Sequence, residues 1–150
     1  MRMLIQRVLE ASVAVNGEVK SKIGLGLLVL SGFEEADSED DLAWAAAKLA
    51  HLRMFDDEQG VMNRSLQDVD GQALIVSQFT LYAQTKKGSR PSYVRAARPE
   101  HAAALYGRFV QLVQRELKKE VGTGVFGADM QVSLVNDGPV TIWVDTKQKE

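Results

Sequence analysis

The feature that most constrains the fold is an Asn16-Gly17 pair between two runs with strand character. Both residues tolerate a positive φ, so the pair favours the type I′ turn that joins two antiparallel strands. Val, Ile and Leu alternate approximately with polar residues over residues 3–15, and residues 18–23 return as a second strand. The sequence therefore predicts a β-hairpin over residues 3–23.

Two helices are predicted farther along the chain. Apolar residues recur at helical spacing over residues 39–54, directly after an acidic segment that suits the positive end of a helix dipole. Pro99 suits the first turn of a helix, where its missing N–H costs nothing, and apolar residues at the same spacing continue to about residue 120. We therefore expect one helix in each half of the chain.

The other apolar segments predict strands. Residues 25–33 are apolar almost throughout, which is typical of a strand covered on both faces, and residues 72–82 give the strongest strand pattern. The full set is 25–33, 61–66, 72–82, 129–136 and 140–146, the last two separated by Asp137-Gly138-Pro139. The predicted order of elements is strands, helix, strands, helix, strands. This order indicates a single α+β domain over residues 1–150 rather than regular βαβ alternation.

The composition excludes several kinds of chemistry. The chain has 150 residues and no cysteine, so a disulfide framework, a zinc-thiolate site, an iron–sulfur cluster and a thiol nucleophile are ruled out. Its two histidines, His51 and His101, fall on the predicted helices without a catalytic motif around them. A conventional serine-hydrolase triad is therefore not expected, and neither is a metal site built on several histidines.

Net charge and hydropathy bear on location and partners. The formal net charge of −2 argues against a protein that coats nucleic acid indiscriminately, but it leaves room for a local basic patch. No stretch approaches the roughly 18 apolar residues of a membrane span, and the N-terminal residues lack the pattern of a signal peptide. We expect a cytoplasmic protein with no membrane association.

Three segments carry polar or basic residues that the fold alone does not require. Ser77, Gln78 and Thr80 fall on the predicted core strand 72–82, where buried polar groups are costly unless cross-strand bonds, a ligand or a partner uses them. The segment 136–141, Asn-Asp-Gly-Pro-Val-Thr, is either a hairpin turn or part of a site. The loop 83–98 is either an ordinary solvated loop or a phosphate contact; its basic residues are Lys86, Lys87, Arg90, Arg95 and Arg98.

Taken together, these segments resemble the D-aminoacyl-tRNA deacylase family. SQFTL stands at 77–81 and NDGPVT at 136–141, matching the two motifs of that family. The resemblance spans nearly the whole chain in the same order; the further matches are IQRV at 5–8, GLLVL at 26–30, MN at 62–63, KGSRPSY at 87–93, LY at 105–106 and FGADMQVSLVN at 126–136. Gln84 departs from it, because many relatives carry an acidic residue there.

The resemblance implies a fold and an assembly. The fold would be a compact α+β domain with antiparallel-rich β-sheets, a barrel-like core and two main helices, and the protein would be a homodimer with its active sites at the subunit interface. In the family, the glycine and proline of the second motif are joined by a cis peptide and reach into the partner's pocket. Gly138 and Pro139 match them, and their backbone would exclude an L-amino acid while admitting a D-amino acid or glycine.

The resemblance also implies the roles of single residues. The catalytic segment would be Ser77, Gln78, Phe79 and Thr80, with backbone N–H groups near Ser77 and Phe79 receiving the aminoacyl group or a developing oxyanion. Thr80 matches a nucleophile proposed in the family, yet no base that would activate it is evident beside it. The expected pocket residues are Phe126 and Met130, which would receive the terminal adenosine, together with Asn136 and Thr141.

The expected reaction is hydrolysis of the ester bond of D-aminoacyl-tRNA, with glycine mischarged on tRNA-Ala as a further substrate. No cofactor, metal or DNA is expected. The ester is already activated and the neighbouring ribose hydroxyl can assist water, so the protein needs mainly to position the substrate and stabilise charge. The basic loop would hold tRNA phosphates. Two alternatives remain: a non-catalytic homodimer that binds RNA or a small molecule, and a serine esterase in which His101 approaches Ser77 or Thr80.

Overall fold

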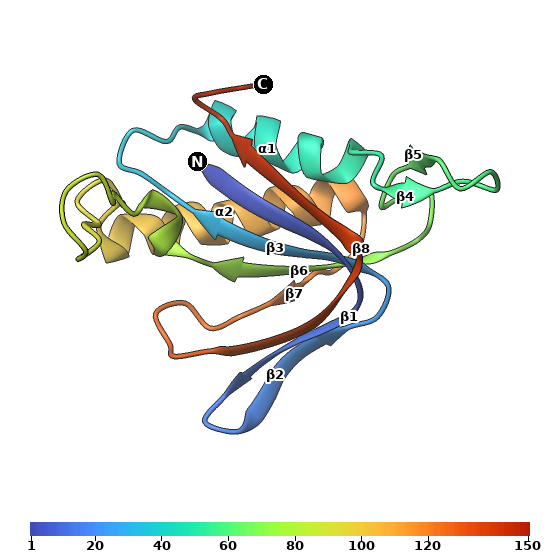
Figure 1. Cartoon of the computed structure of the whole chain (residues 1–150), viewed down its shortest axis with the longest axis horizontal. Coiled ribbons are helices and arrows are strands. Elements are labelled where there is room, and N and C mark those ends of the chain that lie inside the picture. The colour runs from blue at the N-terminus through green and yellow to red at the C-terminus, as the bar shows by residue number, and fades with distance from the viewer.

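The sheet is built around one long strand, β1 (Arg2–Val15), in a computed structural model that describes residues 1–150 (Figure 1). Along one edge, β1 pairs with β2 (Glu18–Ile23) and β3 (Gly26–Gly32). Along its other edge it pairs with β8 (Gln131–Asp145). All three pairings are antiparallel, which confirms the predicted hairpin and the antiparallel-rich sheet.

The second part of the sheet is parallel. β6 (Gln72–Ser77) lies beside β3, and β7 (Gly122–Thr123) lies beside β6. The chain returns to this part of the sheet through α1 (Glu39–His51) and α2 (Pro99–Leu117), which pack against each other on one face of the sheet (Figure 1). The hydrogen-bonded path through the sheet is β2-β1-β3-β6-β7, and β8 pairs with β1 off this path.

The sheet curls toward a barrel, because β2 also contacts β6 and β7. A short hairpin of β4 (Phe55–Asp56) and β5 (Met62–Arg64) extends from the end of α1 (Figure 1). The result confirms the predicted α+β class with two main helices. Neither helix is long and apolar enough to cross a membrane.

Apolar side chains cover both faces of the central strands. The larger cluster lies between the helices and the sheet, and the smaller one lies on the opposite face. In β3, Leu27 and Val29 belong to the first cluster and Leu28 to the second, and all three are buried. The continuous apolar run of this strand is therefore explained by burial on both sides, as the sequence predicts.

The helices begin where they are predicted and end earlier. Ser38 and Asp41 form a capping box at the start of α1, since each side chain bonds the backbone of the other. α1 ends at His51 rather than at residue 54, and α2 ends at Leu117, where Lys118 takes a left-handed conformation with φ of 56°. A left-handed residue is a common end to a helix, and it explains where α2 stops. Both helices were predicted a few residues too long at their C-terminal ends.

Two strand predictions are wrong in a way that matters for the site. The strand predicted over 72–82 ends at Ser77, after which Phe79–Tyr82 form a 3₁₀ helix, η1. The N–H of Gln78 donates to Ser31 O at 2.7 Å, and the chain then turns through bonds such as Ala83 N to Thr80 O at 3.0 Å. Gln78 and Thr80 therefore do not lie on a core strand, because they belong to a turn at its end.

The second correction concerns the end of the chain. The two strands predicted at 129–136 and 140–146 are one strand, β8, that runs through Asp137-Gly138-Pro139 without a hairpin. β1 pairs with β8 on both sides of this segment, and its register shifts between Gln6 and Val8 and again between Val8 and Glu10. These irregularities absorb the extra residues, so the motif forms a bulge in a continuous strand.

Candidate functional site

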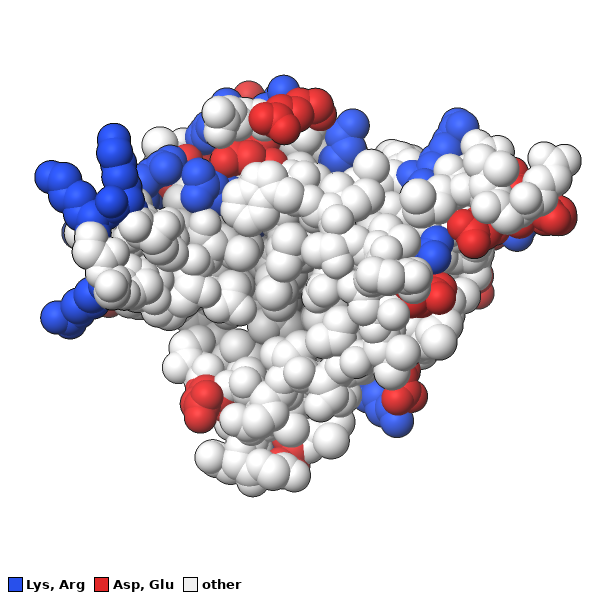
Figure 2. Space-filling model, in the orientation of Figure 1, with Lys and Arg blue, Asp and Glu red and all other residues white.

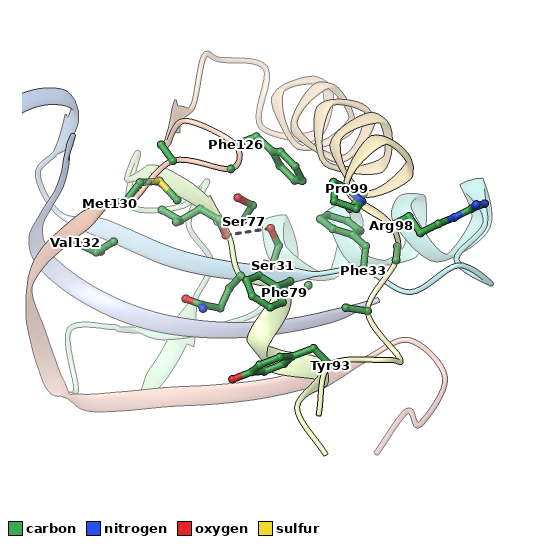
Figure 3. Close-up of a pocket in the computed structure, with 18 residues that line it drawn as sticks. Ser31, Phe33, Ser77, Phe79, Tyr93, Arg98, Pro99, Phe126, Met130 and Val132 are labelled. Carbon is green, nitrogen blue, oxygen red and sulfur yellow. Dashed lines mark hydrogen bonds between the residues drawn. The ribbon is translucent and has the colours of Figure 1, made fainter. Parts of the chain in front are cut away.

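A cavity of about 640 Å³ opens at the carboxyl ends of the parallel strands β3 and β6 (Figure 3). Four parts of the chain line it: the end of β3, the end of β6 with the start of η1, the segment entering α2, and the segment entering β8. Of its 18 lining residues, 11 are hydrophobic. A largely apolar cavity with a few polar groups is the usual form of a small-ligand site.

Both side chains and backbone contribute polar groups near the cavity. The Ser31 hydroxyl is occupied, since it donates to Val76 O at 3.2 Å. Phe79 and Thr80 open the 3₁₀ helix η1, so their N–H groups have no partner within that helix. Such free N–H groups at the end of a buried strand are suited to bind a carbonyl oxygen or an oxyanion.

Aromatic rings stand on two sides of the cavity. Phe126 packs against Tyr106 with ring centroids 5.9 Å apart, and the Tyr106 hydroxyl donates to Ile75 O at 2.8 Å. Burial raises the pKa of Tyr106 to about 12, which keeps that hydroxyl a neutral donor. Phe79 and Tyr93 meet edge to face at the rim, 5.0 Å apart at an interplanar angle of 73°. The site therefore offers flat apolar surfaces to a ligand.

The structure brings together only some of the predicted residues. Ser77, Gln78, Phe79, Phe126 and Met130 all line the cavity, and Arg98 joins them from the segment before α2. Thr80 does not line it, and its hydroxyl accepts a hydrogen bond from the Gln78 amide.

No acid–base group activates the predicted nucleophiles. His101 lies 3.9 Å from a Glu35 carboxylate oxygen and does not line the cavity, so it makes no bond to Ser77 or Thr80. The arrangement required by the serine-esterase alternative is therefore not present. No three His, Cys, Asp or Glu side chains gather in a way that could hold a metal ion.

The 136–141 segment lies outside the cavity of its own chain. The peptide between Gly138 and Pro139 is cis, and Gly138 has φ of 137°. Asn136 Oδ1 accepts from Val140 N at 2.9 Å, while its amide donates to Thr141 Oγ1 at 3.0 Å. The expectation that Asn136 and Thr141 line the pocket thus fails within one chain, because both side chains instead fix the shape of the bulge.

Comparison with known proteins decides the family. The family model described as "D-Tyr-tRNA(Tyr) deacylase" matches residues 4–145. The chain belongs to the D-Tyr-tRNA(Tyr) deacylase family. This confirms the resemblance carried by SQFTL and NDGPVT.

Individual relatives of this deacylase family match over full length. Proteins called "D-aminoacyl-tRNA deacylase" from Dechloromonas aromatica and Bacteroides thetaiotaomicron are 61% and 56% identical over 150 residues, all of this chain and all of theirs. A solved structure called "c-Myc DNA Unwinding Element Binding Protein" is 39% identical, with a TM-score of 0.92 over 97% of this chain and 98% of that one. A probable eukaryotic D-amino acid tRNA deacylase is 21% identical, with a TM-score of 0.81 over 95% and 97%, and shares the fold.

One buried arginine of this deacylase chain was not singled out from the sequence. Arg7 lies on β1, where its Nε donates to Asp137 O at 3.0 Å and its Nη1 donates to Met54 O at 2.8 Å. It also lies 3.3 Å from a carboxylate oxygen of Asp56. The signal that could have revealed it is a charged residue inside an alternating apolar strand, since a buried charge needs partners. Arg7 fixes the backbone that leads into Gly138.

The predicted basic residues divide into two sets. Arg95 and Arg98 face carboxylates, 3.5 Å from Glu34 and 3.2 Å from Glu35 respectively. The other three cations, Lys86, Lys87 and Arg90, are exposed and have no ion pair; they lie in a loop closed by a bridge between residues 84 and 92. Figure 2 shows Lys and Arg gathered at the left of the molecule, where Figure 1 draws this loop. The uncompensated positive charge thus stands beside the cavity rim.

Proposed function

We propose that the protein hydrolyses the ester bond of D-aminoacyl-tRNA and releases the free D-amino acid and tRNA. It would thereby act in chiral proofreading during translation, in the cytoplasm. The observation that carries this proposal is the apolar cavity, lined by Phe79, whose backbone N–H group has no partner within η1, in a chain of this family. Its relatives from two bacteria, named as deacylases of this class, cover the whole chain and support the same activity.

The chemistry follows from what the cavity contains. Water attacks the ester carbonyl carbon, the N–H group of Phe79 stabilises the negative charge that develops on the carbonyl oxygen, and the bond to the ribose oxygen breaks. The ribose oxygen leaves with a proton, and the amino acid keeps the oxygen of water. The neighbouring ribose hydroxyl supplies proton assistance, and the terminal adenosine rests on Phe126. This route needs no side-chain nucleophile.

Selection of the D-isomer would come from a second copy of the chain. Asn136, Gly138, Pro139 and Thr141 do not line the cavity of their own subunit, so they act on a substrate only if a partner inserts them. In the proposed homodimer, the Gly138-Pro139 backbone of each subunit enters the partner's cavity and excludes an L side chain. Glycine, including glycine mischarged on tRNA-Ala, would be accepted because it has no side chain to exclude.

A face with few charged side chains and an exposed tryptophan supports the proposed dimer. On the outer side of the sheet, Trp143 of β8 lies opposite Leu4 of β1 and is 49% exposed. Figure 2 shows the middle of this face, over β1 and β8, almost free of charged side chains. Exposed apolar patches of this kind mark association surfaces, and a two-fold axis would place the same patch on both subunits.

The basic loop would bind tRNA without reading its sequence. Lys86, Lys87 and Arg90 carry free positive charge near the rim and suit contacts to phosphates. Arg95 and Arg98 are proposed as secondary contacts, because each already faces a carboxylate. Phosphate binding tolerates different tRNA sequences, and an enzyme that edits many tRNAs requires such tolerance.

The decisive experiment compares matched substrates. Purified protein treated with a chelator is mixed with D-tyrosyl- and L-tyrosyl-tRNA, and release of the amino acid is followed. We expect rapid release from the D-ester only. Binding without release would favour the non-catalytic alternative, and equal release of both isomers would exclude the chiral role. Loss of activity in His101→Ala would point to the serine-esterase alternative instead.

A further inference from the structure

Tyr93 stands at the junction between the cavity and the basic loop. It lines the rim of the cavity, and it directly follows Ser92, which closes the loop by two backbone bonds to Gln84 of 2.8 and 3.0 Å. Its side chain is 39% exposed although its ring packs edge to face on Phe79. Figure 3 shows Tyr93 beside Phe79, away from the Phe126 side of the cavity. The terminal-adenosine role assigned to Phe126 therefore leaves Tyr93 unused.

We propose that Tyr93 is a stacking platform for the penultimate nucleotide of the RNA, the one that precedes the terminal adenosine. The inference rests on the proposed function and extends it from the terminal residue to the strand behind it. Along the surface the order would be adenosine in the cavity, the next base on the Tyr93 ring, and its phosphates toward Lys86 and Lys87.

The chemistry of the surface matches a single RNA strand. Sites for single-stranded nucleic acid combine exposed aromatic rings with neighbouring positive charge, and every base can stack because every base has a flat π face. The Phe79 contact holds the Tyr93 ring in place before RNA arrives, which lowers the ordering cost of binding.

The charges around Tyr93 favour RNA over an apolar partner. Lys86, Lys87 and Arg90 have no ion pair in this chain, whereas the nearby acidic groups Glu34 and Glu35 are already turned to Arg95 and Arg98. A phosphate chain passing Tyr93 therefore meets free cations on the loop side.

The test compares two substrates that differ only in the RNA behind the adenosine. One is D-tyrosyl-tRNA and the other is D-tyrosyl-adenosine, which has no penultimate nucleotide. We expect Tyr93→Leu, which keeps an apolar contact to Phe79, to raise KM for the tRNA about tenfold more than it raises KM for the adenosine ester. Tyr93→Phe, which keeps the ring, should restore the wild-type KM for tRNA. An equal rise in KM for both substrates, or no rise for either, would overturn the proposal.

A binding measurement separates this proposal from the proposed activity. A short RNA ending in adenosine, with the fluorescent base 2-aminopurine in the penultimate position, is titrated with the protein. We expect quenching with the wild type and with Tyr93→Phe, because stacking quenches this base, and little quenching with Tyr93→Leu. Quenching that is the same in all three proteins would overturn the stacking role even if the enzyme is active. If the wild type hydrolyses neither ester, the proposed hydrolase activity is wrong. The quenching measurement would still show whether the penultimate base stacks on Tyr93.

Discussion

At the scale of single residues, Gly138 is the most constrained position in the proposed selectivity segment. Its φ of 137° lies in the region that favours glycine, and an added Cβ would stand 2.7 Å from Val140 Cγ2 and 2.9 Å from Val140 N. Gly138→Ala should therefore lower the free energy of unfolding by about 1–3 kcal/mol and lower kcat/KM for the D-ester by roughly 10²-fold. Urea unfolding and amino acid release check the two effects. Gly107→Ala, in an open position on α2, is the control and should stabilise the protein by about 1 kcal/mol.

Thr80 gives a second prediction at this scale. Its hydroxyl accepts from the Gln78 amide, does not face the cavity and has no base beside it. Thr80→Ala should therefore lose less than about tenfold in kcat/KM for D-tyrosyl-tRNA, whereas loss of a true nucleophile costs on the order of 10⁴ to 10⁶. Single-turnover release of the amino acid measures the difference. A loss on the larger scale would restore Thr80 as the nucleophile.

At the scale of elements, a short stretch of sequence predicts those turns and helices whose structure depends on neighbouring residues. Asn16-Gly17 and the periodicity of the two helices are read correctly, because a turn and an apolar stripe are properties of a few neighbouring residues. The end of β6 and the continuity of β8 are not predicted correctly from the sequence, because each depends on contacts with a strand far away in the chain. β6 stops where its last bond reaches Ser31 of β3, and β8 continues through Pro139 because β1 shifts its register opposite it. The contacts of Arg7 were missed for the same reason.

The start of α1 gives a prediction with a pH dependence. Burial opposes the charge of Asp41, but hydrogen bonds from Lys147 Nζ at 2.6 Å and from Ser38 hold its pKa well below the usual range. A pKa that is lower in the folded state stabilises the fold above about pH 4 and ceases to do so as pH falls through the folded value. Asp41→Asn should lower the free energy of unfolding by about 1 kcal/mol at pH 7, and the difference should shrink progressively as the pH falls below about 4. Urea unfolding at each pH measures this, and Asp40→Asn, an exposed neighbour, should change little.

At the scale of the whole molecule, the cavity and the selectivity segment occupy different places in one chain. The sheet topology assembles the cavity from β3, β6, η1, α2 and the start of β8, and no local pattern in the sequence shows that these meet. The motifs did name five residues that line the cavity, which are Ser77, Gln78, Phe79, Phe126 and Met130, but they named only a minority of its lining. The separation of Gly138 from the cavity could not be predicted from the sequence, because it depends on the path of β8 across the sheet.

In the proposed homodimer, this separation would make selectivity for the D-ester depend on association, and Trp143 tests the link. Trp143→Asp removes a large exposed apolar side chain and places a carboxylate on this face of each subunit, so two carboxylates would be desolvated in a two-fold interface. The dissociation constant of the dimer should rise at least about tenfold, and selectivity for the D-ester should fall as monomer replaces dimer. Sedimentation velocity and D- and L-ester release at several protein concentrations measure both quantities. Val61→Asp, an exposed apolar position on the β4–β5 hairpin, should leave them unchanged. A monomeric Trp143→Asp protein with full D-selectivity would show that one chain suffices, and the Gly138-Pro139 segment would then need another role.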